Sequence, residues 1–244
     1  MIPSVTDNSA LFLDIDGTIL DMARTPEAVV VPPELPAALE RLRDRLDGAL
    51  ALVSGRSLAL IDTLFLPFRP AAVGCHGAEV RGAQGRVTEL APPIPDTVRA
   101  LFRELAGLYP GLLLEDKVHA LALHYRQAPQ AWPELEAIME RNQTLFRAEQ
   151  VSILHGKAVI DARPVGVDKG AGVRALMATT PFAGRIPLFG GDDTTDLDVF
   201  RVLPQLGGEG FSVGKRFPGA RYLFDNPASV RHWLTREAGQ DLAA

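Results

Sequence analysis

The sequence is poor in several features that mark broad classes of protein. It contains a single cysteine, Cys75, so no disulfide can form within the chain, and we expect a protein of the reducing cytoplasm. No apolar run approaches the roughly 20 residues that a membrane-spanning helix needs, and a basic segment followed by an apolar one, the pattern of a secretory signal, is not found near Met1. Acidic residues outnumber basic ones by 30 to 25, which argues against a nucleic-acid partner. We expect a monomer whose partner is a small-molecule substrate, with neither a nucleic acid nor a membrane involved.

Apolar residues are plentiful, at 47% of the chain, and near both ends they alternate between short strand-like runs and helically spaced segments. This order predicts right-handed crossovers and a doubly wound, Rossmann-like parallel sheet of the α/β class. The predicted strands cover residues 9–14, 49–53, 71–75, 186–189 and 210–213, and the predicted helices cover 35–46, 57–66, 168–178, 194–203 and 227–236.

The middle of the chain has a different pattern. A hairpin is predicted over 78–88, followed by the proline-rich linker 91–95. Beyond it, helical spacing and period-two alternation predict a small α+β module of order αββαββ. Its parts are a helix over 96–108, strands over 112–115 and 120–126, one helix over 133–149 and a hairpin over 151–154 and 158–162. We therefore divide the chain into a core, residues 1–92 and 165–244, and an inserted domain, residues 93–164.

Chemically useful side chains follow the predicted strands of the core. Asp14 and Asp16 stand two apart at the end of a strand, so both carboxylates leave on the same side. Ligands of open parallel sheets bind beyond the carboxyl ends of the strands, where Ser54 and Lys169 are also expected. Acidic side chains from two strand ends supply the oxygen ligands that Mg²⁺ prefers, and together with a lysine they suit phosphoryl transfer. The second acidic group consists of Asp192, Asp193 and Asp196.

These segments resemble, in order, the four motifs of the haloacid dehalogenase superfamily, and the insert stands where type-C2 cap domains of that superfamily occur. The motif residues are Asp14-Ile15-Asp16-Gly17-Thr18, Ser54, Lys169 and Gly191-Asp192-Asp193-Thr194-Thr195-Asp196. Further segments are similar to the trehalose-6-phosphate phosphatase family: Ser54-Gly55-Arg56, Gly74-Cys75-His76-Gly77-Ala78-Glu79, Leu114-Glu115-Asp116-Lys117, Ala122-Leu123-His124-Tyr125-Arg126, Gly156-Lys157-Ala158-Val159-Ile160-Asp161 and Arg163-Pro164.

The resemblance implies a cytoplasmic, Mg²⁺-dependent phosphatase that completes trehalose biosynthesis through an aspartyl-phosphate. Asp14 would be the nucleophile and a metal ligand, and Asp16 the general acid and base, with its backbone carbonyl on the metal. Asp192 would be the other protein ligand of the metal. Asp193 and Asp196 would support it, and Ser54 and Lys169 would hold the phosphoryl oxygens.

The resemblance also implies residues that bind the sugar phosphate. Glu115 and Lys117 would hydrogen-bond sugar hydroxyls, with a third contact expected near Asp161, where the family usually has Glu. Leu197 stands where a Glu commonly follows the fourth motif. The remaining substrate-binding candidates are Thr18, Gly55, Arg56, His76, Gly77, His124, Arg126 and Lys157.

Other interpretations of the same residues remain open. Asp16 and Gly17 alone are typical of a hairpin turn, Ser54 of a helix cap and Lys169 of a solvated helix residue. A histidine such as His76 or His124 is as often structural as functional, and the pair Glu115 and Lys117 is typical of a surface ion pair. The alternatives for the whole chain are another sugar-phosphate or phosphoglycerate phosphatase of the superfamily, a phosphotransferase or mutase, and a non-catalytic sugar-phosphate-binding protein.

Overall fold

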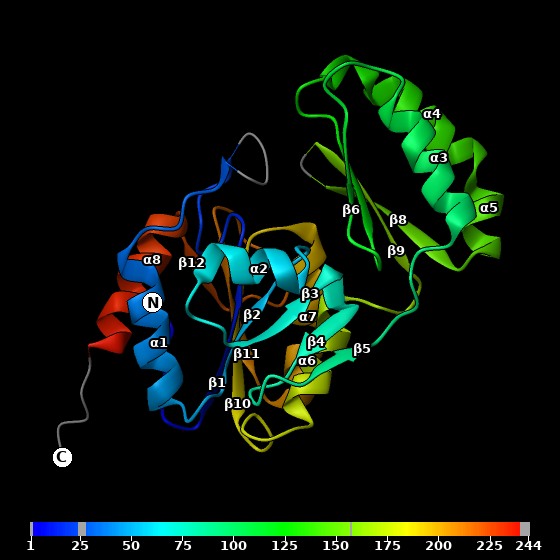
Figure 1. Ribbon diagram of the computed structural model, residues 1–244. Coiled ribbons are helices and arrows are strands. Elements are labelled where there is room, and N and C mark those ends of the chain that lie inside the picture. Colours follow the sequence, from blue (N-terminus) through cyan, green and yellow to red (C-terminus); the bar gives the residue numbers. More distant parts are fainter. Residues whose placement is uncertain (1, 24–27, 157, 240–244) are drawn as a thin grey trace. The chain divides into compact units, whose positions relative to one another are not determined.

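The structure is a computed structural model, and it describes residues 2–23, 28–156 and 158–239. The chain forms two compact units. The first combines Met1–Thr88 with Asp168–Ala244, and the second is Glu89–Val167. Figure 1 shows the elements of both units.

The first unit is built on an eight-stranded sheet of order β12-β11-β10-β1-β2-β3-β4-β5. Pairing is parallel from β12 to β3, and β4 joins β3 in the antiparallel direction. The prediction of a doubly wound α/β fold is confirmed. The strands are β1 (Ser9–Asp14), β2 (Leu50–Val53), β3 (Ala71–Gly74), β4 (Glu79–Arg81), β5 (Val87–Glu89), β10 (Ile186–Gly191), β11 (Glu209–Val213) and β12 (Tyr222–Phe224).

Helices cover both faces of this sheet. One face carries α1 (Glu34–Arg45) beside α8 (Pro227–Ala238), and α6 (Lys169–Met177) packs beside α7 (Leu197–Val202) on the other (Figure 1). Helix α2 (Leu58–Phe65) packs on β3. Because parallel strands between two helical layers are buried on both sides, every residue of β1 is buried.

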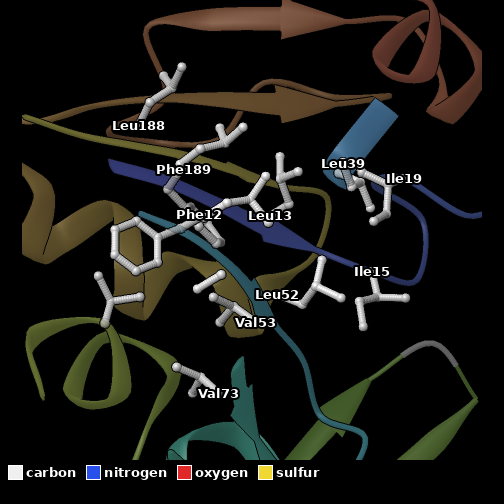
Figure 2. Packing of buried hydrophobic residues seen from close by; sticks show 14 of the residues in the cluster. Phe12, Leu13, Ile15, Ile19, Leu39, Leu52, Val53, Val73, Leu188 and Phe189 are labelled. Atoms are coloured by element: carbon white, nitrogen blue, oxygen red, sulfur yellow. The ribbon is translucent and has the colours of Figure 1, made fainter. Parts of the chain in front are cut away.

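Apolar side chains fill the space between sheet and helices. Figure 2 shows Phe12 and Leu13 of β1 beside Leu52 and Phe189 of the neighbouring strands. Phe12 also stacks on Phe182 with ring centroids 5.3 Å apart. The well-packed centre of the sheet is β1, so the residues at its carboxyl end are held on a rigid support.

The second unit is a four-stranded antiparallel sheet of order β6-β7-β9-β8 with its own apolar core. In Figure 1, the three α-helices of the unit lie together on one side of this sheet. The strands are β6 (Leu113–Asp116), β7 (Leu121–His124), β8 (Val151–Gly156) and β9 (Val159–Pro164), and the helices are α3 (Asp96–Ala106), α4 (Trp132–Arg141) and α5 (Gln143–Ala148).

Two sequence predictions about elements were wrong. The single helix expected over 133–149 is divided into α4 and α5 at Asn142, whose side-chain amide donates to the carbonyl of Ile138 at 2.9 Å. Asparagine competes in this way for backbone partners and disfavours a continuous helix. Strand β12, residues Tyr222–Phe224, was not predicted, because three residues are too few to display a period of two. Within the described ranges, no helix is both long and apolar enough to cross a membrane.

Candidate active site

The chain turns sharply at the carboxyl end of β1, directly after the two aspartates. Gly17 has a positive φ of 86°, and its N–H donates to the carbonyl of Leu20 at 2.8 Å. A Cβ atom at Gly17 would lie 2.2 Å from Oδ2 of Asp192. Only glycine therefore allows the loop after β1 to approach the loop after β10 this closely, which brings the first and fourth motifs together.

Asp14 lies in a buried polar network. Its Oδ2 accepts a hydrogen bond from the hydroxyl of Thr18 at 2.8 Å, and its Oδ1 accepts one from Nζ of Lys169 at 2.8 Å. Lys169 is the first residue of α6, a position fixed by the N-cap Asp168, whose side chain accepts from the N–H of Ala171. Nζ of Lys169 also donates to Oδ1 of Asp196 at 2.6 Å. The ammonium of Lys169 therefore links the end of β1 to the loop after β10 through the carboxylates of Asp14 and Asp196.

Asp196 organises the loop after β10. Its Oδ2 accepts the backbone N–H groups of Asp192 at 2.8 Å and Asp193 at 2.9 Å, while Oδ1 receives Lys169. Asp193 caps the short helix η4 (Thr194–Asp196) by accepting the N–H of Thr194. Asp196 and Asp193 therefore support the loop, and the carboxylate of Asp192 lies beside Gly17.

Negative charge exceeds positive charge in this site. Burial raises the pKa of Asp14 well above its ordinary value, and the carboxylates of Asp196 and Asp192 add to the rise, whereas Lys169 opposes it. Burial alone would lower the pKa of Lys169, but Asp14 and Asp196 outweigh it, so that pKa is raised and the lysine stays charged. One lysine does not balance the three acids, and an additional cation would keep Asp14 ionised.

The donor atoms suit a hard divalent cation. Asp14, Asp192 and Asp196 each offer a carboxylate oxygen, and these oxygens lie within 4.8 Å of one another. Oxygen-only ligands favour Mg²⁺ over zinc. Asp14 and Asp196 share the ammonium of Lys169, and the carboxylate of Asp192 lies beside Gly17.

Asp16 is held by Arg56, a pairing that the sequence did not indicate. Nε and Nη2 of Arg56 donate to the two oxygens of Asp16 at 2.7 and 2.8 Å, which is the bidentate geometry of a strong arginine–carboxylate pair. Arg56 follows β2 by three residues, and its backbone N–H donates to Oγ of Ser54 at 3.1 Å. The two partners are 40 residues apart, so no local pattern in the sequence marks the pair, although Arg56 lies in the segment Ser54-Gly55-Arg56 that resembles the family.

The turn after β3, the 3-10 helix η2 (Cys75–Gly77), supports the loop that carries Ser54 and Arg56. The N–H of His76 donates to the carbonyl of Ser54 at 3.1 Å. A Cβ atom at Gly55 would lie 2.5 Å from the imidazole of His76, and one at Gly77 would lie 2.0 Å from the carbonyl oxygen of Asp168. The structure thus places Gly55, His76 and Gly77 as close-packed supports of the loop and of the start of α6.

The remaining site candidates belong to the second unit. Oε2 of Glu115 lies 3.3 Å from Nζ of Lys117 and 3.4 Å from Nε2 of His124. Burial acts to raise the pKa of Glu115, but the His124 hydrogen bond and the Lys117 charge outweigh it and lower that pKa. Oε1 of Glu115 is buried with no hydrogen-bond partner among the described residues.

The register of the second sheet places Asp161 on the same face. Glu115 pairs with Ala122, and Ala122 pairs with Asp161 on the next strand, so the two acids flank a small side chain. Arg126 is exposed just beyond β7. Lys157 lies outside the described residues. The structure therefore gathers the predicted residues into two groups, one in each unit.

The first unit, with a buried acid cluster at the carboxyl edge of its parallel sheet, defines the class. This combination, together with an inserted α+β unit, is the one expected of the haloacid dehalogenase superfamily.

Comparisons with known proteins place the chain within this class. The family profile described as trehalose-phosphatase matches residues 12–218. A probable trehalose-phosphate phosphatase of Sinorhizobium fredii is 45% identical over 225 residues, which cover 91% of this chain and 84% of the relative. The trehalose-6-phosphate phosphatase of Escherichia coli is 37% identical, over 95% and 87% of the two chains. The chain belongs to the trehalose-phosphatase family, and it is a phosphoric monoester hydrolase.

Solved structures agree with the fold. The C-terminal domain of the C. albicans trehalose-6-phosphate phosphatase superposes with a TM-score of 0.82 at 23% identity, covering 97% of this chain and 98% of that one. A trehalose-6-phosphate phosphatase related protein superposes with a TM-score of 0.77 at 25% identity, covering 93% and 96%.

Proposed function

We propose that the chain hydrolyses trehalose 6-phosphate to trehalose and inorganic phosphate, with Mg²⁺ as cofactor and Asp14 as nucleophile. The observation that carries the proposal is the buried network of Asp14, Lys169 and Asp196 at the end of β1, in a chain of this family. Such a network holds a carboxylate oxygen that can attack phosphorus, and a positive charge that can bind the phosphoryl oxygens, in fixed positions. Phosphoryl transfer requires both.

In the first step, an oxygen of Asp14 attacks phosphorus. The bond from phosphorus to the sugar oxygen breaks as the bond to Asp14 forms. Asp16 enters this step protonated, with Arg56 turned to the phosphate, and gives that proton to the departing oxygen. In the second step, Asp16 takes a proton from a water molecule that attacks phosphorus. Phosphate is then released and the Asp14 carboxylate is restored.

The other residues of the first unit hold charge during these steps. Lys169 and Ser54 would hold phosphoryl oxygens. Arg56 would be shared between Asp16 and the incoming phosphate, because a dianion competes for a guanidinium. A Mg²⁺ ion bound by Asp14, Asp192 and the backbone carbonyl of Asp16 would supply positive charge beside the phosphoryl oxygens.

The second unit would recognise the sugar. Glu115 presents a buried acceptor oxygen without a partner among the described residues, and Lys117 and His124 hold the other oxygen. Neutral hydroxyls donate to and accept from such groups, and a buried acceptor left unsatisfied is costly. Asp161, one methylene shorter than Glu, would offer a third contact from the same face.

The test is a phosphate-release assay with trehalose 6-phosphate, glucose 6-phosphate, phosphoglycerate and a small aryl phosphate, each with Mg²⁺ and with a chelator. We expect the highest kcat/KM for trehalose 6-phosphate, and no phosphate release in chelator. Phosphoglycerate as the best substrate would overturn the sugar assignment. Binding of sugar phosphate without turnover would identify a non-catalytic binder. Consumption of sugar phosphate only with an added acceptor, which itself becomes phosphorylated while no inorganic phosphate appears, would identify a phosphotransferase.

A further inference from the structure

The turn between β6 and β7 holds Val118 in a backbone conformation that valine rarely adopts. Val118 has a φ of 68°, and β-branched residues at positive φ are outliers. The N–H of His119 donates to the carbonyl of Lys117 at 2.8 Å, so the hydrogen bond spans three residues. These are the features of the γ-turn with positive φ, a rare and strained turn. The strain falls directly after Lys117, one of the proposed sugar-binding residues.

A single side chain clasps this turn from helix α3. Nη2 of Arg99 donates to the carbonyl of Val118 and to the carbonyl of Ile94, each at 3.2 Å. Nη1 of Arg99 pairs with Oδ2 of Asp116. Asp116 in turn accepts the N–H of Val118 through Oδ1 at 3.1 Å. Arg99 therefore contacts both sides of the strained residue, directly at the carbonyl and through Asp116 at the amide.

The same carbonyl is tied to the segment that leads into α3. The N–H of Ile94 donates to the carbonyl of Val118 at 2.9 Å, so that oxygen accepts from Ile94 and from Arg99. The Arg99 side chain is only 12% exposed. Its planar fork reaches several fixed oxygens at once, which a lysine cannot do.

The turn has a consequence for Lys117 and Glu115. The backbone N–H of Lys117 donates to the carbonyl of Ala120 at 2.9 Å, which closes the strand pair around the turn. The Lys117 side chain is 7% exposed and contacts Glu115. Were Val118 to relax to a negative φ, the backbone at Lys117 would rotate and the ammonium would leave that position.

We propose that Arg99 is a positioning residue for substrate recognition, which keeps Val118 in its strained γ-turn and so fixes Lys117 and Glu115 toward the sugar. This inference rests on the proposed function for the identity of the substrate. The clasp itself, from Arg99 through Asp116 to Val118, depends only on the contacts within the second unit.

The test compares Arg99→Ala with Arg103→Ala in the full chain. Arg103 is a matched control, because it lies one turn further along α3 and within 3.9 Å of Asp116, but its side chain is 65% exposed. It has no hydrogen bond to the turn among the bonds of the described residues. We expect Arg99→Ala to raise the KM for trehalose 6-phosphate about tenfold, since small misplacements of positioning groups have effects of this size or larger. We expect kcat/KM for a small aryl phosphate to change by less than about twofold in both variants.

Amide hydrogen exchange provides a readout that is independent of activity. We expect the amide of His119 to exchange about tenfold faster or more in Arg99→Ala, and at the wild-type rate in Arg103→Ala. Should Arg99→Ala not fold, Arg99→Lys replaces it with the same expectations, because an ammonium cannot bond the three oxygens together.

A rescue variant separates positioning from general stability. Glycine adopts positive φ without strain, and Val118 is 52% exposed, so Val118→Gly removes little packing. We expect Val118→Gly combined with Arg99→Ala to recover most of the lost affinity for trehalose 6-phosphate. A merely structural role of Arg99 would leave the double variant as impaired as Arg99→Ala.

The possible results decide between distinct conclusions. An unchanged His119 exchange rate in Arg99→Ala overturns the clasp, and faster exchange with an unchanged KM overturns its role in recognition. A wild-type enzyme that shows no preference for trehalose 6-phosphate over the aryl phosphate contradicts the proposed function instead. In that case the exchange measurement still tests the clasp.

Discussion

The two units of this protein hold their charged residues in different ways. In the first unit, the side chains of Asp14, Lys169 and Asp196 are 6%, 4% and 0% exposed and bonded to one another. In the second, Glu115 and His124 are 19% and 26% exposed, and one oxygen of Glu115 has no partner among the described residues. Preorganised charge favours a transition state, whereas open hydrogen-bonding capacity favours a neutral ligand. The comparison supports the proposal that bonds are broken in the first unit and that the sugar is chosen in the second.

The largest effect is expected from the nucleophile. Asp14→Asn should lower kcat by about 10⁴-fold or more for every phosphate ester, because no other group replaces an attacking carboxylate. Burial and the neighbouring acids raise the pKa of Asp14, so its ionised form destabilises the folded state. Asp14→Asn removes this charge and should therefore be at least as thermostable as the wild type in chelator. A phosphate-release assay and a melting curve measure both. Turnover retained in Asp14→Asn would show that Asp14 is not the nucleophile, and would contradict the difference proposed between the two units.

Metal removal should affect the first unit alone. We expect a chelator to abolish phosphate release from both trehalose 6-phosphate and an aryl phosphate, and added Mg²⁺ to restore it. The reason is that Asp14, Asp192 and Asp196 carry more negative charge than Lys169 balances. Addition of Mg²⁺ should also raise the melting temperature, since a ligand that binds only the folded state stabilises it. Asp192→Asn, as the control, should lose most of this metal-induced rise.

Removal of Lys169 should change stability as well as rate. In chelator, Lys169→Met leaves Asp14 and Asp196 facing each other without a counter-ion, and breaking a buried ion pair costs about 3–5 kcal/mol. We expect the free energy of unfolding, measured with urea, to fall by that order. The control Lys215→Met removes an exposed lysine that lies over the ring of Phe217 and has no ion pair with the acid cluster among the described residues, and should cost less than about 1 kcal/mol. Equal losses in the two variants would show that the network contributes nothing specific.

The sequence predicts the fold and the motif residues of the first unit well, but it does not predict contacts between residues far apart in the chain or the turn at Val118 in the second unit. The strand β1 and the motif residues Asp14 and Asp16 follow from an apolar run that ends in polar residues, because parallel strands align their carboxyl ends. Lys169 opens helix α6 and follows no strand of this sheet, so only its resemblance to a motif indicated it. The bond from Arg56 to Asp16 joins residues 40 positions apart, and no local pattern encodes such a pairing. The γ-turn at Val118 contradicts the preference of valine itself, and the contacts that hold it come from Ile94, Asp116 and Arg99.

A smaller and more selective effect is expected in the second unit. Glu115→Gln should raise the KM for trehalose 6-phosphate about tenfold, because the amide cannot reproduce a carboxylate that accepts from Lys117 and His124. The kcat/KM for an aryl phosphate, which has no sugar hydroxyls, should stay within about twofold. Glu104→Gln on α3 is the control, since no hydrogen bond or ion pair of its side chain is found among the described residues. A parallel loss on both substrates would show that Glu115 serves the chemistry and not the choice of sugar.

The smallest effect is a pH dependence of stability that comes from Glu115. Its pKa is lowered below the ordinary value of 4.5 in the folded protein, so the carboxylate stabilises the fold above pH 4.5. That contribution is lost as the pH falls through the folded pKa, because in this range the unfolded state binds a proton at Glu115 more readily than the folded state does. The melting temperature of the wild type should therefore exceed that of Glu115→Gln at pH 7, and the difference should shrink in acid. A difference that stays constant from pH 7 to about pH 3 would show that lost packing, and not lost charge, explains the variant.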